Sequence, residues 1–195
     1  MPLTAGVAVI PHWASAAICQ QLQELPVSWT DVNLPGSREA VRTGDGGGAY
    51  SYQIADLQGR ADGLYEQARQ TAEATLNEPI ALSPFGELAV VMKRYPAGAG
   101  EQGWHTDTNS LTALLYLNDC PDGGVTEVID FNGDHQHIQP EQGKLLLMEG
   151  RRCWHCAHPA GSSTKEIALF NLYRPGDHYR PAQTSSLILG QVPVG

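Results

Sequence analysis

Positive charge is scarce in this chain. It carries 12 Lys and Arg against 21 Asp and Glu, which gives a formal net charge of −9 at pH 7. General nucleic-acid binders and proteins that dock on anionic membranes need a basic surface to displace counterions. We therefore expect no nucleic-acid partner and no membrane partner.

Long apolar runs are also missing. No stretch approaches the ~20 apolar residues that cross a bilayer. The first sixteen residues, MPLTAGVAVIPHWASA, carry no Lys or Arg ahead of their short apolar run, which is atypical of a secretory signal peptide. The sequence therefore predicts a soluble cytoplasmic protein.

Cysteine is rare, at 4 residues in 195. Without a secretion signal, free thiols are expected rather than a disulfide framework. Cys153 and Cys156 form a C-x-x-C pair, which suggests zinc or redox chemistry, but the sequence has no second pair of this spacing to complete a zinc site. The His155 that lies between them offers a different use of this segment.

The composition is that of a globular protein with many turns. Hydrophobic residues make up 42% and charged residues 17% of the chain, with 21 Gly and 13 Pro. This composition excludes a disordered or coiled-coil protein, and the length suits one domain over residues 1–195. Frequent Gly and Pro favour short strands joined by turns.

The pattern changes near residue 87. Before it we expect a helical support over 1–86, with a helix at 16–25 capped by Ser15, a short strand at 50–54 and a longer helix at 57–76. After it, apolar runs with turn residues between them predict a core over 87–190. The expected strands are 88–92, 111–117, 126–131, 136–139, 145–148 and 167–173. This spacing is typical of an antiparallel sandwich or barrel with helices outside it.

His105-Thr106-Asp107 could bind a metal. Alternate residues of an extended chain project to the same side, so H-x-D places an imidazole and a carboxylate together. A later histidine would complete a 2-His-1-carboxylate site, which leaves open positions at Fe(II). By itself this motif occurs by chance in many proteins.

Further motifs surround it at fixed spacings. A leucine-rich run at 143–148 leads through a polar turn to His155, which Pro159 follows four residues later and Lys165 ten residues later. Tyr95 lies ten residues before His105, and a Tyr-Leu-Asn strand end at 116–118 and a Gly-Gly-x-Thr turn at 123–126 lie between His105 and His155. Over residues 88–176 the chain resembles the prolyl 4-hydroxylase-like superfamily of Fe(II)/2-oxoglutarate-dependent dioxygenases.

The resemblance implies an α+β, mainly β fold: a double-stranded β-helix (jelly roll, cupin-like) core with helices packed on one face. It also implies that His105, Asp107 and His155 bind Fe(II). Lys165 and the Tyr95 hydroxyl would bind the distal carboxylate of the cosubstrate 2-oxoglutarate, because a buried carboxylate needs charged and hydrogen-bonding partners. O2 is the second cosubstrate, and ascorbate is a candidate reductant.

The activity implied is hydroxylation, or another oxidation, of an unactivated C–H bond with release of succinate and CO2. Asp107 favours this over halogenation, because related halogenases lack that carboxylate. The expected substrate is a small molecule such as a free amino acid or a biosynthetic intermediate; the alternative is a residue of a peptide or protein. Two competing hypotheses are a cupin-type metalloenzyme without 2-oxoglutarate and a non-catalytic β-sandwich binding protein.

Residues that bind substrate are harder to identify from sequence. Loops before the core and strand ends supply pocket walls in such folds, which makes Trp104, Arg38, Arg42 and Tyr52 the candidates. His158 competes with His155 as the third metal ligand. The histidines at 135 and 137 are expected to be exposed. Arg174 could have a role in the site or could only form a salt bridge at the sheet, and the oligomeric state is not predicted.

Overall fold

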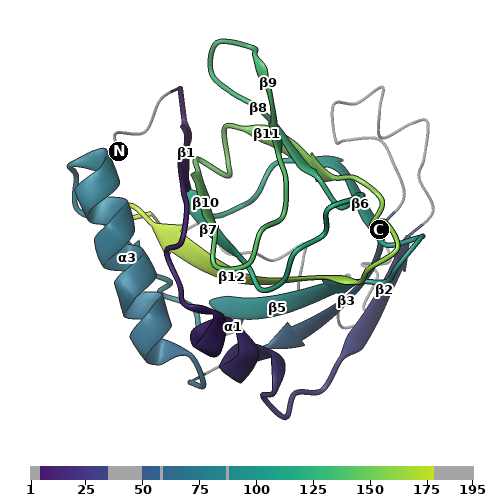
Figure 1. Cartoon of the computed structure of the whole chain (residues 1–195). Coiled ribbons are helices and arrows are strands. Elements are labelled where there is room, and N and C mark those ends of the chain that lie inside the picture. The colour runs from purple at the N-terminus through teal and green to yellow at the C-terminus, as the bar shows by residue number, and fades with distance from the viewer. Residues whose placement is uncertain (1–4, 35–49, 58, 87, 178–195) are drawn as a thin grey trace, which may run out of the picture.

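The structure is a computed structural model that describes residues 5–34, 50–57, 59–86 and 88–177. Within these residues, twelve strands form a single antiparallel sheet that curls over on itself, with two helices outside it (Figure 1). The strands are β1 (Val7–Ile10), β2 (Thr30–Leu34), β3 (Tyr50–Asp56), β4 (Ala81–Leu82), β5 (Val90–Tyr95), β6 (Glu101–His105), β7 (Leu111–Tyr116), β8 (Thr126–Ile129), β9 (His135–Ile138), β10 (Leu145–Met148), β11 (Trp154–Ala157) and β12 (Lys165–Tyr173). The predicted mainly β, antiparallel architecture is confirmed.

The sheet has two halves. The strand order β1-β10-β7-β12-β5-β3 forms the larger half, and β6-β11-β8-β9 forms the smaller one. Strand β3 pairs with both β5 and β6 and so joins them. The remaining strands extend the larger half, β2 on β3 and β4 on β12. The two halves thus enclose an interior, which is the arrangement of a double-stranded β-helix.

Successive side chains of the central strand β7 point to opposite faces of the sheet and so contribute to two separate cores. Leu111, Ala113 and Leu115 contribute to a core that the sheet shares with the helices. Leu114 and Tyr116 face the other way, into the core between the two halves. All six residues of β7 are buried, as expected for a strand covered on both faces.

The helices pack on the outer face of the larger half. Helix α1 (Ala16–Gln23) begins at Ser15, whose side chain accepts a hydrogen bond from the Ile18 amide at 3.3 Å. Helix α3 (Asp62–Leu76) buries Tyr65, Ala68 and Ala72 along one side. It starts five residues later than the predicted 57. Gly59, in a left-handed turn (φ +74°), lies in the part of the predicted helix that is not helical.

The stretch before residue 87 is less helical than predicted. It supplies β1, β2, β3 and β4 to the sheet as well as both helices. Strand β1 is only four residues long, and its partner β10 lies some 140 positions away in the sequence (Val7 opposite Met148). The strand propensity of its own residues does not predict a strand this short, because the pairing with β10 is what stabilises it.

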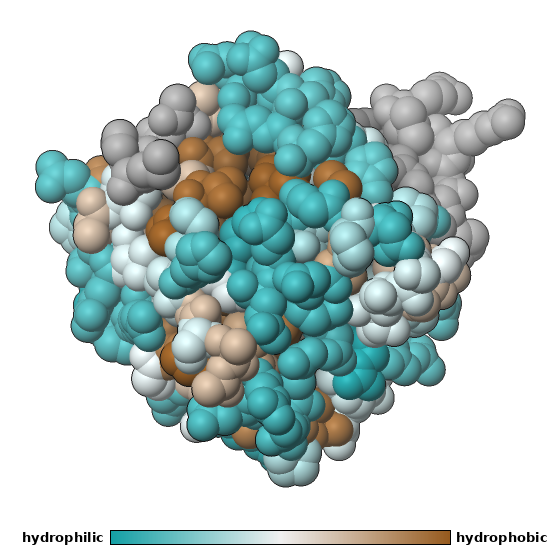
Figure 2. All heavy atoms as spheres, in the orientation of Figure 1, coloured by the Kyte–Doolittle hydropathy of each residue, from teal (hydrophilic) through white to brown (hydrophobic). Residues whose placement is uncertain are grey.

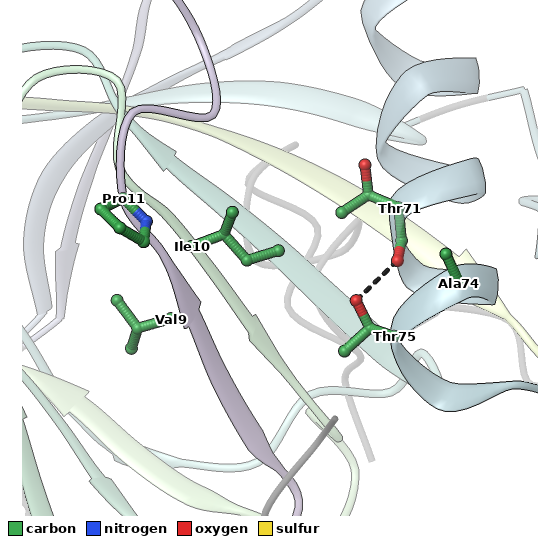
Figure 3. A pocket seen from close by; sticks show the side chains of 6 residues that line it. All are labelled: Val9, Ile10, Pro11, Thr71, Ala74 and Thr75. Carbon is green, nitrogen blue, oxygen red and sulfur yellow. Dashed lines mark hydrogen bonds between the residues drawn. The ribbon is translucent and has the colours of Figure 1, made fainter. Parts of the chain in front are cut away.

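A cavity of roughly 410 Å³ lies between β1 and α3, on the side that carries the helices (Figure 3). Its lining is mostly aliphatic with two threonine hydroxyls: Val9, Ile10, Pro11, Thr71, Ala74 and Thr75. The face shown in Figure 2 is largely hydrophilic, with separate apolar patches. Among the described residues, no helix is long and apolar enough to cross a membrane.

Candidate metal centre

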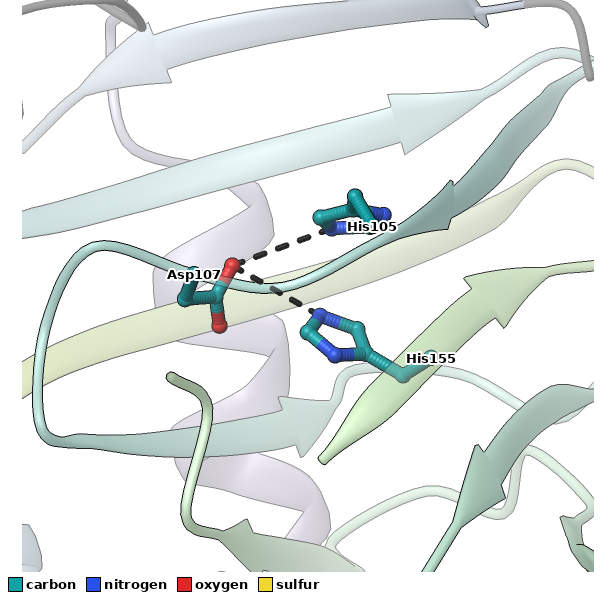
Figure 4. Close-up of side chains that lie close together, drawn as sticks. All are labelled: His105, Asp107 and His155. Atoms are coloured by element: carbon teal, nitrogen blue, oxygen red, sulfur yellow. Dashed lines mark ion pairs between the residues drawn. The ribbon is translucent and has the colours of Figure 1, made fainter. Parts of the chain in front are cut away.

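The structure brings the three predicted metal ligands together in the interior. His105 ends β6, Asp107 follows two residues later, and His155 lies on β11 directly opposite His105. The Asp107 Oδ1 atom lies 3.7 Å from His105 Nε2 and 3.5 Å from His155 Nε2 (Figure 4). The ligand atoms of all three lie within 4.8 Å of one another. They form one face of two imidazoles and one carboxylate.

Both imidazole rings are oriented by the backbone. The Nδ1 atom of His105 lies 2.7 Å from the carbonyl oxygen of Gly103, and that of His155 lies 3.0 Å from the carbonyl of Cys153. A carbonyl only accepts hydrogen bonds, so each Nδ1 carries a proton and each Nε2 faces the interior. Burial, and then the nearby His155, lowers the pKa of His105 to about 3. Its ring is therefore neutral, the form that binds metals.

Asp107 is fixed by the end of the larger half. Its amide donates to the Gly150 carbonyl at 2.8 Å, and its Oδ2 accepts a hydrogen bond from the Thr112 hydroxyl. Asn109 in turn donates to that hydroxyl at 2.9 Å. Burial alone would raise the pKa of Asp107, but His155, His105 and the Thr112 hydroxyl lower it well below its usual value. The carboxylate is ionised and oriented before any metal binds.

Lys165 and Tyr95 are also brought together in this interior. They lie opposite each other on β12 and β5, and the ammonium lies 4.5 Å from the centroid of the Tyr95 ring. Lys165 is fully buried, and its Nζ donates to the Gly124 carbonyl at 2.8 Å. Burial lowers the pKa of Lys165 to about 7. No carboxylate within the described residues forms an ion pair with it, so a buried cation here lacks its anion.

Two further buried hydroxyls, those of Tyr116 and Thr126, were not predicted as site residues. Tyr116 Oη and Thr126 Oγ1 have no hydrogen-bond partner among the described residues, although Thr126 lies close enough to influence the Tyr116 pKa. Tyr116 lies opposite Ile167 on β12, two residues beyond Lys165 and on the same face. Unpaired buried polar groups are costly. Their position suits a bound polar ligand that accepts hydrogen bonds.

Lys93 and Gln102 also lie near the predicted metal ligands, and the sequence analysis did not identify them as site residues. Lys93 lies two residues before Tyr95 and so faces the same interior. Its Nζ donates to Gln102 Oε1 at 2.8 Å, as does the Tyr95 hydroxyl at 3.0 Å. The Gln102 amide nitrogen donates to His105 Nε2 at 2.9 Å, so this amide must turn away when a metal binds there. The period-2 alternation through Tyr95 is the signal that could have identified Lys93.

The residues present suit both a metal and 2-oxoglutarate. Two imidazoles and one carboxylate on one face form the 2-His-1-carboxylate donor set typical of Fe(II) oxygenases, and the face opens onto the interior. The Lys165 ammonium, which has no carboxylate partner among the described residues, and the Tyr116 and Thr126 hydroxyls suit a carboxylate bound in the same interior.

The structure separates the predicted substrate residues. Tyr52 faces the interior, with its ring centroid 5.5 Å from that of Tyr95. Trp104 lies on the opposite side of β6 from His105, where its ring centroid is 6.1 Å from that of His135. It therefore lies outside the interior rather than beside the metal face. Arg38 and Arg42 lie outside the described residues.

The remaining residues singled out from the sequence lie elsewhere. His158 contacts Glu127 and not the metal face, so the structure favours His155 as the third ligand. All four cysteines are buried free thiols, as predicted. Arg174 forms ion pairs with Glu78 at 2.8 Å and Glu149 at 3.3 Å.

Solved structures of similar shape were found, whereas no protein-family model and no curated protein matches the sequence. An oxidoreductase of the 2OG-Fe(II) oxygenase family from Burkholderia pseudomallei matches with a TM-score of 0.68 at 10% identity, over 90% of this chain and 89% of its own. The non-heme alpha ketoglutarate dependent carbocyclase SnoK from nogalamycin biosynthesis matches with 0.65 at 13%, over 93% and 90%. A prolyl hydroxylase from Trichoplax adhaerens, in complex with a hypoxia inducible factor peptide, matches with 0.56 at 17%, over 94% and 87%.

These identities are low, so the likeness shows the fold alone. It confirms the fold that the sequence resemblance implied. The chain adopts the jelly-roll fold of solved 2OG-Fe(II) oxygenases, prolyl hydroxylase included.

Proposed function

We propose that this protein is an Fe(II)- and 2-oxoglutarate-dependent dioxygenase that oxidises an unactivated C–H bond and releases succinate and CO2. One observation carries the proposal. The metal-binding face of His105, Asp107 and His155 opens onto the same interior as a buried cation, Lys165, that has no anion. A metal site alone would not need that lysine.

The protein's residues would have separate roles. His105, Asp107 and His155 would hold Fe(II), which supplies the activation of O2 when bound. Lys165 would bind the distal carboxylate of 2-oxoglutarate. Tyr95 and the unpaired Tyr116 hydroxyl would donate hydrogen bonds to it, so the cosubstrate would reach the metal with its oxo-acid end. Apolar walls around these groups exclude water.

The substrate that we propose is a small molecule with an anionic group, such as an amino acid or a biosynthetic intermediate. Support comes from Lys93, a second cation, partly buried, near the metal face. When a metal binds His105, the Gln102 side chain must give up its hydrogen bond to that ring. The Gln102 amide and the Lys93 ammonium could then both bind a ligand. The SnoK carbocyclase supports a biosynthetic small molecule. The peptide alternative is supported by the Trichoplax prolyl hydroxylase and its peptide complex.

An anaerobic titration of the purified protein with Fe(II) and 2-oxoglutarate tests the activity class. A weak visible charge-transfer band should form only when both are present. Lys165→Ala should weaken 2-oxoglutarate binding by roughly 10- to 100-fold, the usual worth of a charged hydrogen bond. Iron binding should survive in this variant, because Lys165 touches none of the three metal ligands.

The control and the contrary outcomes distinguish the competing functions. Lys144→Ala removes a lysine whose partners are the Gln139 carbonyl and Glu141, so it should leave cosubstrate affinity unchanged. A folded protein that binds Fe(II) but forms no band would favour a cupin-type enzyme without 2-oxoglutarate. A folded protein that binds neither would overturn the proposal. Succinate release, screened against amino acids, small acids and proline-containing peptides, would then identify the substrate class.

A further inference from the structure

The outer face of the smaller half carries a second group of metal-binding side chains. Strands β11, β8 and β9 lie side by side in that order, and β8 and β9 form a hairpin that projects from the molecule (Figure 1). Five side chains that can bind metals gather over them. These are Glu127 from β8, His135 and His137 from β9, Cys156 from β11, and His158 just after β11.

Strand register explains why they meet. Cys156 lies directly opposite Glu127, and Glu127 lies directly opposite His137. Side chains opposite each other on neighbouring strands have Cβ atoms about 4.5–5.5 Å apart. His135 and His158 each lie two residues from a member of this row, so they project to the same face. A carboxylate thus lies in the middle of a group of imidazoles and a thiol.

The contacts are close. Glu127 Oε2 lies 2.5 Å from His158 Nε2, and Glu127 Oε1 lies 2.6 Å from His135 Nδ1 and 3.5 Å from His137 Nε2. The Cys156 Sγ atom lies 3.8 Å from His158 Nε2. The ligand atoms of Glu127, Cys156 and His158 all lie within 4.8 Å of one another.

Hydrogen bonds between imidazoles and the carboxylate explain part of this cluster. They lower the pKa of Glu127, with the largest effect from His135, and they keep a nearly buried carboxylate satisfied. They do not require a thiol facing the same point, and they do not require three imidazoles on one carboxylate. A mixed set of N, O and S donors is what Zn²⁺ and similar borderline-soft ions prefer.

We propose that Glu127, Cys156 and His158 form a second metal site, for Zn²⁺ or a divalent ion of similar softness, with His135 or His137 as the fourth ligand. In a tetrahedral site the ligand atoms lie roughly 3.3–3.8 Å apart. The sulfur–nitrogen distance of 3.8 Å already suits this geometry. Glu127 and His158 must move apart by about 1 Å, which the half-exposed His158 allows, and the excess negative charge of the chain favours a cation.

Occupancy would have a mechanical consequence. Cys156 follows His155 on β11, and the two project to opposite faces of that strand. A metal on the outer face would tie the β8–β9 hairpin to the strand that carries the inner ligand. The proposal does not rest on the dioxygenase assignment, because none of its three ligands belongs to the inner site.

Cobalt(II) is the probe that separates the two sites, because only the outer one contains a thiol. Added to the metal-free full-length protein, Co²⁺ should produce a thiolate-to-cobalt charge-transfer band in the near ultraviolet. The band should vanish in Cys156→Ser and in His158→Ala. It should persist in Asp107→Ala, which damages the inner site, and in Cys153→Ser, which removes a buried thiol of the interior core. Zn²⁺ should displace the cobalt and abolish the band.

Metal stoichiometry gives an independent measurement. In competition with a chromophoric chelator, Glu127→Gln should bind one equivalent of Zn²⁺ fewer than the unsubstituted protein and keep its circular dichroism spectrum. The proposal is overturned if the unsubstituted protein shows no thiolate band. It is also overturned if the band survives Cys156→Ser or His158→Ala, or if Glu127→Gln binds as much zinc. Should Cys156→Ser fail to fold, His158→Ala and Glu127→Gln still decide.

Discussion

Lys165 is the residue whose protonation most directly links the structure to the proposed activity. Burial lowers its pKa to about 7, from an ordinary value of 10.5. A 2-oxoglutarate carboxylate bound to it would favour the charged form and raise that pKa again. Below pH 7 the lysine is already protonated, so binding needs no proton. Above pH 7 binding must take one up, and the affinity falls.

We therefore expect 2-oxoglutarate to bind with constant affinity below about pH 7 and up to roughly tenfold more weakly for each pH unit above it. Isothermal titration calorimetry at several pH values, with Mn²⁺ in place of iron, measures this. At pH 8 the heat of binding should depend on the buffer's ionisation enthalpy, because one proton is taken up. In Lys165→Arg the side chain stays charged, so the slope should disappear. An affinity that rises with pH would contradict the assignment.

Lys93 is predicted to act on the substrate more than on the cosubstrate. It lies one row of side chains away from the pair formed by Lys165 and Tyr95, since it is opposite Ile167. Lys93→Met keeps the apolar length of the side chain and removes its charge. With the right substrate, KM should rise by roughly 10- to 100-fold, whereas 2-oxoglutarate affinity should change little. A loss confined to 2-oxoglutarate binding would instead make Lys93 part of the cosubstrate site.

At the scale of elements, the turn between β10 and β11 limits the position of Asp107. A Cβ atom on Gly150 would lie 2.5 Å from Thr112 Oγ1 and 2.7 Å from Asp107 Oδ2. Gly150→Ala should therefore displace the carboxylate without unfolding the sheet. We expect metal affinity to fall by about 10- to 100-fold, as when groups that orient a ligand are lost.

Gly63→Ala is the matched control for this substitution. Gly63 lies in α3 with open space around its Cβ position, so the new methyl group touches nothing. It should stabilise the protein by about 0.5–1 kcal/mol, because alanine favours the helix, and should leave metal binding unchanged. Thermal unfolding and metal titration of both variants check the pair. Equal metal affinities in the two would show that Gly150 does not restrict Asp107.

Some helices and strands can be predicted from the sequence more easily than others. Strands β7, β10 and β12 are continuous apolar runs, and the sequence located them to within a few residues. Strand β6 (Glu101–His105) carries polar residues and a glycine, so pairing with β11 and β3 defines it more than composition does. The three proposed metal ligands, which the structure brings together, were predicted from motif spacing. Lys93 and Tyr116 did not, because an interior-facing polar residue on a strand looks like its neighbours until the opposite half is in place.

At the scale of the whole molecule, the candidate metal centre draws its residues from both halves of the sheet. His105 and His155 belong to the smaller half, whereas Thr112, which fixes Asp107, belongs to β7 in the larger half. Direct strand pairing joins the halves only through β3 and β6 within the described residues. A metal bound by all three ligands would therefore add a second connection between the halves, at the end of the interior where the strands do not pair.

This connection predicts where metal binding stabilises the protein. At a free metal concentration of 100 times the Kd, the free energy of unfolding should rise by about 2.7 kcal/mol. Hydrogen exchange should slow most in β6, β11 and the start of β7, and least in α1 and α3, which lie on the far side of the larger half. Mn²⁺ and 2-oxoglutarate added without oxygen allow this to be measured without turnover. Asp107→Ala keeps both histidines but removes the link to Thr112, so it should lose the protection at β7. If hydrogen exchange slowed equally in the helices and in both halves of the sheet, the metal would stabilise the fold as a whole. It would then not act as a specific connection between the two halves.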